Sequence, residues 1–370
     1  HRPDLAIAFL ERAIELTGQG GTVGFLVPAK LATAAYAATA RGALAGETRI
    51  HCANDLSRDC RPAFRAAAYP FALVVSRAKA DPAHRVRTVL EPATPGHIPQ
   101  GELRTGPWVL AEAGVRRAQQ RLTDGVPALG DRFRIHLGVK TGLNEVFLDP
   151  PTPLEPGLLR WAVRGRDVRP FGVRPSRRLL WTHAGTGQPL PALPPRATAY
   201  LARHRDRLQG RRDFVGGPWW TLFRTGPASA AYRVVWADLS RRLEACALAN
   251  PETTGLIPLN TCYLLPTEGR DTALGLVAWL NSTWVRALAA MVADPAAGGF
   301  RRFSAAVIGR LPLPGSVLED RELVTLAMEG QAGRLEQAAL DEACARHLPL
   351  TPDDRNALTL LVPPARAGRR

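Results

Sequence analysis

Apolar residues recur at helical spacing near the start of the chain. Leu5, Phe9 and Ala13 fall on one face of a helix, and Asp4 is a residue type that caps helix N-termini. The pattern therefore predicts an amphipathic helix over residues 4–16. Glycines follow this segment and end the helical pattern.

Four further segments alternate in character. Residues 22–27 form a mostly apolar run typical of a buried strand, and the alanine-rich residues 30–44 predict a second helix. A weaker strand at 49–53 and an apolar strand at 72–75 complete the region. The order helix, strand, helix, strand, strand indicates a doubly wound α/β sheet. We expect only about half of such a sheet, because the sequence contains no segments that could form its early strands and its Gly-rich nucleotide-binding loop.

After residue 133 the chain changes to short strand-like runs with frequent glycine and proline. This change predicts a mixed α+β second domain, with two longer helices at 274–292 and 321–345. The expected fold class is α/β, the second half of a Rossmann-like sheet followed by a mixed α+β domain. The expected divisions are 1–80 for the half sheet, 81–130 for a proline-rich connector with a helix near 112–122, 131–320 for the second domain, and 321–370 for a C-terminal helical segment and basic tail.

Composition narrows the class of protein. The 370-residue chain is 46% hydrophobic and 22% charged, with a mean hydropathy of −0.10, as in folded soluble proteins. Its 48 Lys and Arg against 33 Asp and Glu give a net charge of +15. An excess of this size favours a polyanionic partner, and double-stranded DNA is the first candidate.

The positive charge is concentrated in one stretch. Residues 160–242 contain seventeen Arg and only four acids, and five of the eight Trp lie among them. Arg binds phosphate or a guanine edge with two hydrogen bonds, and clustered Arg gains affinity by releasing counterions from DNA. A GC-rich genome would also favour Arg, since the chain has only three Lys, but it does not explain the local lack of acids. We therefore expect this stretch to bind nucleic acid.

Other classes of protein are disfavoured. The five Cys never form a Cys-x-x-Cys pair and the eight His fall in no metal-binding spacing, so we expect no zinc site and no disulfide framework. No secretory signal is present, and the most membrane-like stretch, 274–293, carries Arg286 and other polar residues in its middle. We expect a bacterial cytoplasmic protein with no membrane partner. The start at His1, close to a helical pattern, favours a fragment.

Ordered motifs in the sequence carry a family resemblance. The first part has Asp4-Leu-Ala-Ile-Ala-Phe9-Leu-Glu, Gly20-Gly21 before Phe25-Leu-Val-Pro28-Ala-Lys30, and Phe64 before Tyr69-Pro70 and Leu73-Val-Val. The second part has Gly138-Val-Lys140-Thr141-Gly142-Leu-Asn144-Glu-Val-Phe147, Val163-Arg-Gly-Arg166-Asp167-Val-Arg-Pro170 and Leu276-Val-Ala-Trp-Leu-Asn281-Ser282. In this order they resemble the late catalytic motifs and the target-recognition domain of gamma-class, TaqI-type DNA adenine-N6 methyltransferases. The resemblance covers most of the chain.

The resemblance implies transfer of a methyl group from S-adenosylmethionine to N6 of an adenine that is flipped out of double-stranded DNA. By position, Phe64 matches the aromatic residue that stacks on the flipped adenine, and Phe9 matches one that packs on the adenine ring of the cofactor. Helical spacing alone favours a core role for Phe9, and only the ordered motifs make cofactor contact an equal alternative. The family's cofactor-binding glycine loop and its Asn-Pro-Pro-aromatic motif are missing from this sequence. We therefore expect the chain alone to be inactive.

The segment from Gly138 to Asn144 offers backbone amides and polar side chains that suit phosphate contacts, although a Gly-flanked hairpin turn explains it nearly as well. A later Asp149-Pro150-Pro151 run echoes the missing catalytic motif, but it lacks the aromatic residue and predicts a turn. The candidate DNA-binding residues are Lys140, Thr141, Asn144, Arg164, Arg166, Arg169, Arg211 and Arg212.

Three hypotheses remain at this point. The leading one is the C-terminal portion of a site-specific DNA adenine-N6 methyltransferase, either truncated or completed by an N-terminal methyltransferase half supplied in trans. The second is a stand-alone DNA-recognition module of a restriction-modification system, which would bind DNA without the cofactor. The third is a decayed fragment, which would be poorly soluble because half a sheet leaves an unpaired edge and an exposed apolar face.

Overall fold

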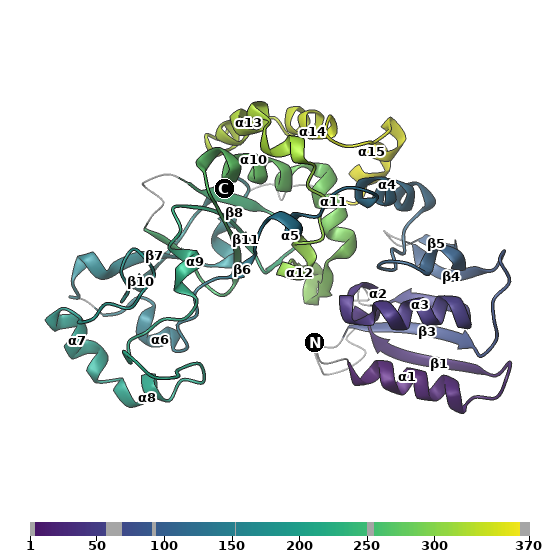
Figure 1. The fold of residues 1–370 in the computed structure, drawn as a ribbon, viewed down its shortest axis with the longest axis horizontal. Helices are drawn as coiled ribbons and strands as arrows, with labels where there is room; N and C mark the ends of the chain where they lie inside the picture. The colour runs from purple at the N-terminus through teal and green to yellow at the C-terminus, as the bar shows by residue number, and fades with distance from the viewer. Residues whose placement is uncertain (1–3, 57–68, 91–93, 152, 250–254, 363–370) are drawn as a thin grey trace. The chain divides into compact units, whose positions relative to one another are not determined.

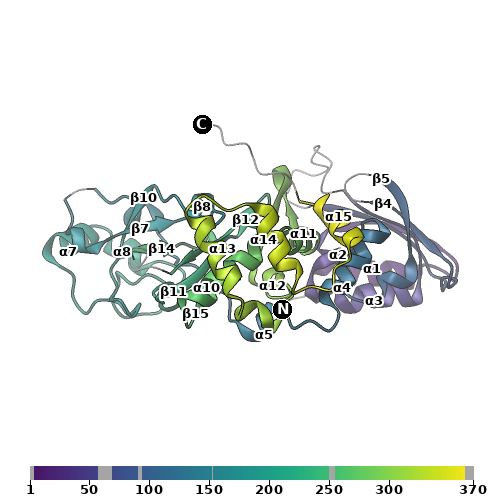
Figure 2. The same ribbon diagram turned by 90° about the horizontal axis from the view of Figure 1, so that it is seen from above.

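The computed structural model describes residues 4–56, 69–90, 94–151, 153–249 and 255–362 (Figures 1 and 2). The chain divides into two compact units. Unit 1 comprises residues 1–124, 287–307 and 349–370, and unit 2 comprises residues 125–286 and 308–348. The backbone therefore passes between the units four times, so each unit combines segments that are far apart in the sequence.

Unit 1 is built on a five-stranded sheet. Its strands are β1 (Thr22–Pro28), β2 (Arg49–Asp55), β3 (Pro70–Ser76), β4 (Arg85–Leu90) and β5 (Thr94–Pro99). They lie in the order β1-β3-β2-β4-β5, and Figure 1 labels β1, β3, β4 and β5 of this sheet. β3 runs antiparallel to β1 and β2, whereas β2 runs parallel to β4 and β4 antiparallel to β5. β1, β2 and β4 therefore point the same way, and their carboxyl ends lie at one side of the sheet.

The first helix, α1 (Leu5–Leu16), forms as the sequence predicts. Asp4 accepts a hydrogen bond from the Ala6 amide at 3.1 Å, which caps the helix. Leu10 is buried in the core that α1 shares with the sheet. Phe9 lies on the other face and is 65% exposed, so the alternative prediction of a core role for Phe9 does not describe this structure.

The helix predicted at 30–44 is interrupted. It consists of α2 (Lys30–Thr33), a 3-10 turn (Ala35–Ala37) and α3 (Ala38–Glu47). The buried guanidinium of Arg41 donates to the carbonyl groups of Leu31 at 2.9 Å and Ala34 at 2.8 Å. In an unbroken helix these carbonyl groups would accept from amides one turn later. Arg41 therefore stabilises the interruption by replacing those bonds.

The sheet continues through residues that were expected to form a connector. β4 and β5 both lie beyond residue 80, and β5 contains Pro95 and Pro99. Proline is tolerated there because β5 is an edge strand. The buried side chain of Gln100 then accepts a hydrogen bond from the Ile50 amide at 2.8 Å, which attaches this segment to β2.

Unit 2 contains two larger sheets that share one core, and one two-stranded sheet. Its strands are β6 (His136–Leu137), β7 (Leu159–Val163), β8 (Val168–Arg169), β9 (Gly172–Val173), β10 (Arg177–Leu180), β11 (Tyr232–Ala237), β12 (Leu239–Ser240), β13 (Ala245–Leu248), β14 (Leu256–Pro258) and β15 (Cys262–Thr267). One larger sheet has the order β13-β11-β15-β6, the other has the order β10-β7-β14, and β8 and β9 form the two-stranded sheet. Buried residues from both larger sheets, including Val163 and Val235, belong to the same hydrophobic cluster.

The remaining helices are distributed over both units. They are α4 (Ala113–Thr123), α5 (Leu129–Arg132), α6 (Asn144–Phe147), α7 (Pro195–Ala202), α8 (Arg205–Gln209), α9 (Thr225–Ala228), α10 (Arg270–Asn281), α11 (Thr283–Val292), α12 (Ala305–Ile308), α13 (Arg321–Gln331), α14 (Gln337–Ala345) and α15 (Pro352–Thr359). In unit 1, β16 (Asp294–Ala296) pairs antiparallel with β17 (Phe300–Arg302). None of the helices in the described ranges has the length and apolar character that crossing a bilayer requires.

Two of the long helices predicted from the sequence are each divided in two. The helix expected at 274–292 is α10 followed by α11, and the one expected at 321–345 is α13 followed by α14. The break in the first falls at Ser282, whose hydroxyl donates to the Trp279 carbonyl at 2.8 Å and accepts from the Val285 amide at 3.3 Å. One side chain thus ends α10 and begins α11.

A buried histidine lies in unit 2. The Nε2 atom of His183 accepts a hydrogen bond from the Leu222 amide at 3.3 Å, and its Nδ1 lies 3.2 Å from the Thr182 hydroxyl. The Thr182 hydroxyl itself donates to the Trp220 carbonyl at 2.8 Å. This arrangement requires a neutral ring with its proton on Nδ1. Burial lowers the pKa of His183 to about 4.

We predict that unit 2 loses stability in mild acid. In the unfolded chain the His183 ring takes up a proton below about pH 6.5, whereas in the folded unit its pKa is about 4. Between these two pH values the unfolded state binds more protons, so lowering the pH favours unfolding. The stability is fully present above about pH 6.5, and the loss reaches about 3 kcal/mol at pH 4. Urea unfolding followed by Trp fluorescence measures it. His183→Gln should flatten this part of the pH profile, whereas the exposed His97→Gln in unit 1 should not.

Candidate functional site

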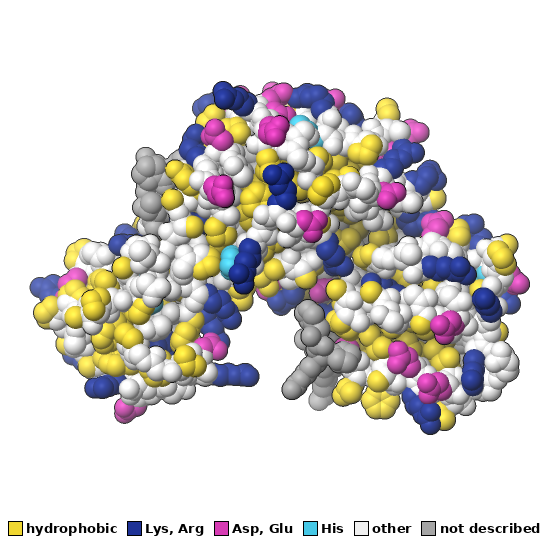
Figure 3. Space-filling model, in the orientation of Figure 1, with side chains coloured by type: hydrophobic (Ala, Val, Ile, Leu, Met, Phe, Trp, Pro, Cys, Tyr) yellow, Lys and Arg dark blue, Asp and Glu magenta, His cyan; other side chains and the backbone are white. Residues whose placement is uncertain are grey.

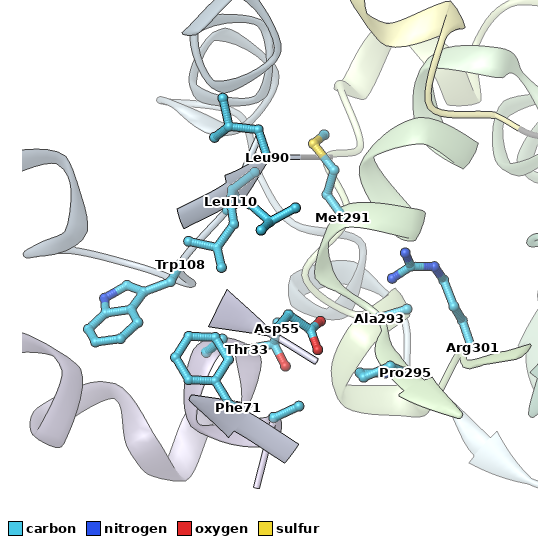
Figure 4. A pocket seen from close by; sticks show the side chains of 14 residues that line it. Thr33, Asp55, Phe71, Leu90, Trp108, Leu110, Met291, Ala293, Pro295 and Arg301 are labelled. Atoms are coloured by element: carbon cyan, nitrogen blue, oxygen red, sulfur yellow. The ribbon is translucent and has the colours of Figure 1, made fainter. Parts of the chain in front are cut away.

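Unit 1 contains a cavity beside its sheet (Figure 4). It holds about 640 Å³ of empty space, part of which is continuous with solvent. Figure 4 shows the side chains of Asp55, Met291 and Arg301 around the same space. The cavity is lined by Ala29, Ala32, Thr33, Asp55, Phe71, Val89, Leu90, Trp108, Val109, Leu110, Met291, Ala293, Pro295 and Arg301.

The cavity lies at the carboxyl ends of the three parallel strands. Ala29 directly follows β1, Asp55 is the last residue of β2, and Leu90 is the last residue of β4. Open α/β sheets bind their ligands just outside these strand ends, because the chain leaves the sheet there and the loops can present different side chains. The topology therefore places this cavity where a ligand site is expected.

The lining combines an apolar wall with a few polar groups. The rings of Phe71 and Trp108 lie 6.1 Å apart between centroids, and the Trp108 indole donates to the Leu103 carbonyl at 2.7 Å. The Thr33 hydroxyl donates to the Asp294 carboxylate at 3.0 Å. Such a lining is typical of sites for small organic ligands. Among the described residues, no three His, Cys, Asp or Glu side chains are grouped so as to hold a metal ion.

Of the two aromatic residues proposed from the resemblance, the structure describes only Phe9. Phe64 falls in residues 57–68, outside the described residues, but that segment begins two residues after Asp55, which lines the cavity. Phe9 lies on α1 and does not line the cavity. Its exposed ring can still pack on a ligand or on another polypeptide.

In unit 2, backbone hydrogen bonds fix the loop of residues 138–144. The Val139 amide donates to the Pro258 carbonyl at 2.8 Å. Lys140 and Phe223 exchange two hydrogen bonds, of 3.0 and 2.9 Å. The loop leads from β6 into α6, so it is not the hairpin turn that the sequence also allowed. Its conformation is set before any ligand binds.

Side chains add to this order. The buried Thr141 hydroxyl donates to the Oδ1 atom of Asn144 at 2.6 Å and accepts from the Leu143 amide at 3.2 Å. Gly142 has φ +70°, and a Cβ atom there would lie 2.8 Å from the Cδ of Arg211. Only glycine fits this position without strain. Asn144 is exposed, and because its side-chain oxygen accepts from Thr141, its NH₂ group is the donor left for a ligand.

Arg211 does not face a ligand, contrary to the DNA contact expected from the sequence. It is buried, and its guanidinium donates to the carbonyl groups of Leu208 at 2.8 Å, Thr141 at 2.6 Å and Trp219 at 2.9 Å. Burial lowers the pKa of Arg211 to about 10, where it is still charged at neutral pH. The three acceptors use all three nitrogen atoms, so Arg211 holds the loop in place.

The other candidates differ in how accessible they are. Arg164 forms a two-point pair with Asp167, at 2.9 and 3.0 Å, and donates to Ser176 at 2.7 Å. Lys140 pairs with Asp213, and the hydrogen bond from Lys140 lowers the pKa of that carboxyl. The exposed candidates are Asn144, Arg166, Arg169 and Arg212. Figure 3 shows Lys and Arg side chains, in dark blue, over the part of unit 2 that contains α6, α7 and α8.

Two features of the site were not found from the sequence. The cavity wall includes Met291, Pro295 and Arg301, which are more than 200 residues from β2 and carry no motif that indicates their neighbours. The second feature is a stacked pair in unit 2, formed by Trp161 and Arg178. Both residues lie in the arginine-rich stretch, but only the strand register places them together.

Comparison with known proteins gives two curated relatives. The type II methyltransferase M.XhoI of Xanthomonas vasicola is 24% identical over 344 residues, which cover 85% of this chain and 62% of the relative. The type II methyltransferase M.PaeR7I of Pseudomonas aeruginosa is 25% identical over an alignment 398 residues long, gaps included, which covers 96% of this chain and 66% of the relative. This chain is related to type II methyltransferases. It spans about two thirds of their length, and no protein-family model matches it.

A solved structure shows a similar fold. The type IIL restriction-modification enzyme MmeI, solved in complex with DNA, superposes on 97% of this chain with a TM-score of 0.63. The superposition covers 51% of MmeI at 13% sequence identity, so it bears on the fold alone. The mixed α/β architecture of this chain is therefore one that a restriction-modification enzyme also uses.

We predict that Arg211→Lys destabilises unit 2 by about 3 kcal/mol, because an ammonium group cannot reach three carbonyl groups in the fork geometry of a guanidinium. Urea unfolding measures the loss, and proteolysis of the 138–144 loop reports its local effect. Arg212→Lys changes the exposed neighbour and should alter stability by less than about 0.5 kcal/mol. Equal effects of the two substitutions would contradict the role assigned to Arg211.

Proposed function

We propose that this chain provides the target-recognition region and part of the catalytic fold of a site-specific DNA methyltransferase that acts on N6 of adenine. The observation that carries the proposal is the cavity at the carboxyl ends of β1, β2 and β4, whose lining residue Asp55 stands nine positions before Phe64 in the sequence. The relationship to type II methyltransferases supports it. In this proposal unit 1 receives the reacting base and unit 2 selects the DNA sequence.

In this proposal the cavity receives a flipped base. Phe71 and Trp108 are buried within its wall, so the base would pack against the accessible apolar side chains of Val89, Leu90 and Pro295, which offset part of the stacking that it loses on leaving the duplex. Phe64 would stack on the other face of the adenine. The Thr33 hydroxyl, which donates its hydrogen to Asp294, and the Asp55 carboxylate are oxygen acceptors at the cavity toward which the N6 amino group of the base could donate.

The residues present fit one end of the cofactor. S-adenosylmethionine would supply the methyl group, and the exposed ring of Phe9 suits packing on its adenine. The family's glycine loop and Asn-Pro-Pro-aromatic motif have no counterpart in this sequence. We therefore assign cofactor contact to Phe9 alone, and the rest of the binding site to other polypeptide.

A methyltransferase half supplied in trans is the proposed source of that polypeptide. Among the described strands, β1 pairs only with β3, so its outer edge is open to another strand. Beside it, Leu5, Phe9 and Leu16 on α1 and Leu26 on β1 are all more than half exposed. An open strand edge with neighbouring apolar side chains favours association with a further α/β element.

Unit 2 provides the proposed DNA surface. The loop of residues 138–144 holds its backbone in place by hydrogen bonds and carries the Asn144 NH₂ group, which can donate to phosphate. The Lys140 ammonium pairs with Asp213 and would have to share its N–H donors with a phosphate. Arg166, Arg169 and Arg212 add exposed guanidinium groups. Arg164 and Arg211 support this surface from within the fold, because their guanidinium groups bind protein oxygens.

The first test is methylation of duplex DNA with labelled S-adenosylmethionine. The chain should be inactive alone and active when mixed with an upstream-encoded polypeptide that carries the glycine loop and the Asn-Pro-Pro-aromatic motif. In the mixture, Phe64→Ala should lower activity at least about 100-fold by removing one stacking face, while Phe64→Tyr keeps the ring and most of the activity. Salt-dependent DNA binding without methylation in any mixture would instead favour the stand-alone recognition module.

A second test addresses the loop. Asn144→Asp replaces the NH₂ group by a carboxylate oxygen that repels phosphate, so we predict at least about tenfold weaker DNA binding. Thr141→Val removes the hydroxyl that holds the Asn144 amide, and we predict about threefold weaker binding. Thr141→Ser keeps the hydroxyl and is the matched control. Fluorescence anisotropy with a labelled duplex measures the DNA affinity of all three variants. If the Asn144→Asp variant bound DNA as tightly as the wild type, this loop would be excluded from the interface.

A further inference from the structure

Trp161 and Arg178 form a stacked pair on the surface of unit 2. They are direct cross-strand neighbours in the register of β7 and β10. The central guanidinium carbon of Arg178 lies 3.6 Å from the centre of the Trp161 ring, which is van der Waals contact distance. Trp161 is 37% exposed and Arg178 is exposed, so the outer side of the guanidinium faces solvent.

The backbone beneath this pair is held in place by Asp149. The Arg178 amide donates to the Asp149 carboxylate at 2.7 Å, and the Asp149 amide donates to the Arg178 carbonyl at 2.8 Å. Asp149 has φ +47°, an uncommon conformation for a residue other than glycine. Residues held in such conformations concentrate at functional sites, where the surrounding structure maintains them. The turn predicted at Asp149 from the sequence thus fixes the position of Arg178.

The charges around the pair leave Arg178 available. The nearby carboxylate of Asp149 forms its ion pair with Arg177, at 2.8 Å, and not with Arg178. The Arg160 guanidinium turns to the carbonyl groups of Gly157 and Leu159. Within the described ranges, the Arg178 guanidinium has no hydrogen-bond acceptor and no carboxylate partner. A guanidinium that is held flat on an indole and keeps its N–H donors unused is preorganised for an anion.

We propose that Trp161 and Arg178 form a phosphate-binding site for the DNA backbone, additional to the loop of residues 138–144. This inference rests on the proposed DNA-binding function of unit 2. The planar guanidinium would donate two parallel N–H groups to two oxygens of one phosphate. Trp161 is a positioning residue, which holds the guanidinium plane by stacking, and its indole does not need to touch the DNA.

The experiment is DNA binding of the full chain, measured by fluorescence anisotropy with a labelled duplex over a range of salt concentrations. Arg178→Ala should weaken binding about tenfold and lower the slope of log affinity against log salt by about 1, because one phosphate contact is lost. Arg178→Lys keeps the charge but loses the planar pair of donors, so its DNA affinity should lie between those of the wild type and the Arg178→Ala variant. Trp161→Phe should keep most of the affinity, and Trp161→Ala should resemble Arg178→Lys.

The matched control is Arg334→Ala, which removes the same charge from an exposed position of unit 2. It should change affinity by less than about twofold. Circular dichroism verifies folding, and Arg178→Gln, which keeps the packing stem, replaces Arg178→Ala if that variant fails to fold. If the wild type binds DNA in a salt-dependent way and Arg178→Ala behaves like Arg334→Ala, the site is disproved and the proposed function stands. If the wild type shows no salt-dependent binding, both proposals fail.

Discussion

Buried guanidinium groups that donate to backbone carbonyls hold the irregular parts of both units in place. In unit 2, Arg211 binds the Thr141 carbonyl and so maintains the loop from which Asn144 projects. In unit 1, Arg41 binds two carbonyl groups at the break between α2 and α3, next to residues that line the cavity. A buried charge is costly when unpaired, so the carbonyl groups and the guanidinium depend on each other. The geometry of both candidate sites follows from these bonds.

This use of arginine divides the basic stretch into two groups with different roles. Arg164 and Arg211 bind protein oxygens inside the fold, whereas Arg166 and Arg178 are exposed. Arg169 is exposed but also donates to the carbonyl groups of Arg166 and Val168. The local excess of positive charge therefore overstates the number of contacts available to a polyanion. The internal arginines still contribute, because a rigid surface loses less conformational entropy when it binds.

The sequence predicts the regular elements of unit 1 well, because α1, β1, β2 and β3 each follow from local periodicity and capping. It does not predict where the long helices break, since those breaks depend on a distant guanidinium or on one serine hydroxyl. The loop of residues 138–144 was proposed as a phosphate contact from its motif and stays a prediction, whereas the internal role of Arg211 was not predicted, because burial is a property of the folded chain. Likewise, the cavity joins strand ends to residues near 300, and the stacked pair depends on strand register.

The repeated passage of the backbone between the units determines the order in which they can be completed during synthesis. Unit 1 contains the first helix and also α15, whose Asp354 pairs with Arg121 of α4 at 2.5 Å. A ribosome therefore releases all of unit 2 before the last helix of unit 1 is available to cover α4. Until then the apolar face of α4 is accessible to water and to chaperones. Unit 1 therefore contains the first helix of this chain to be synthesised, yet it is completed only when α15 packs against α4.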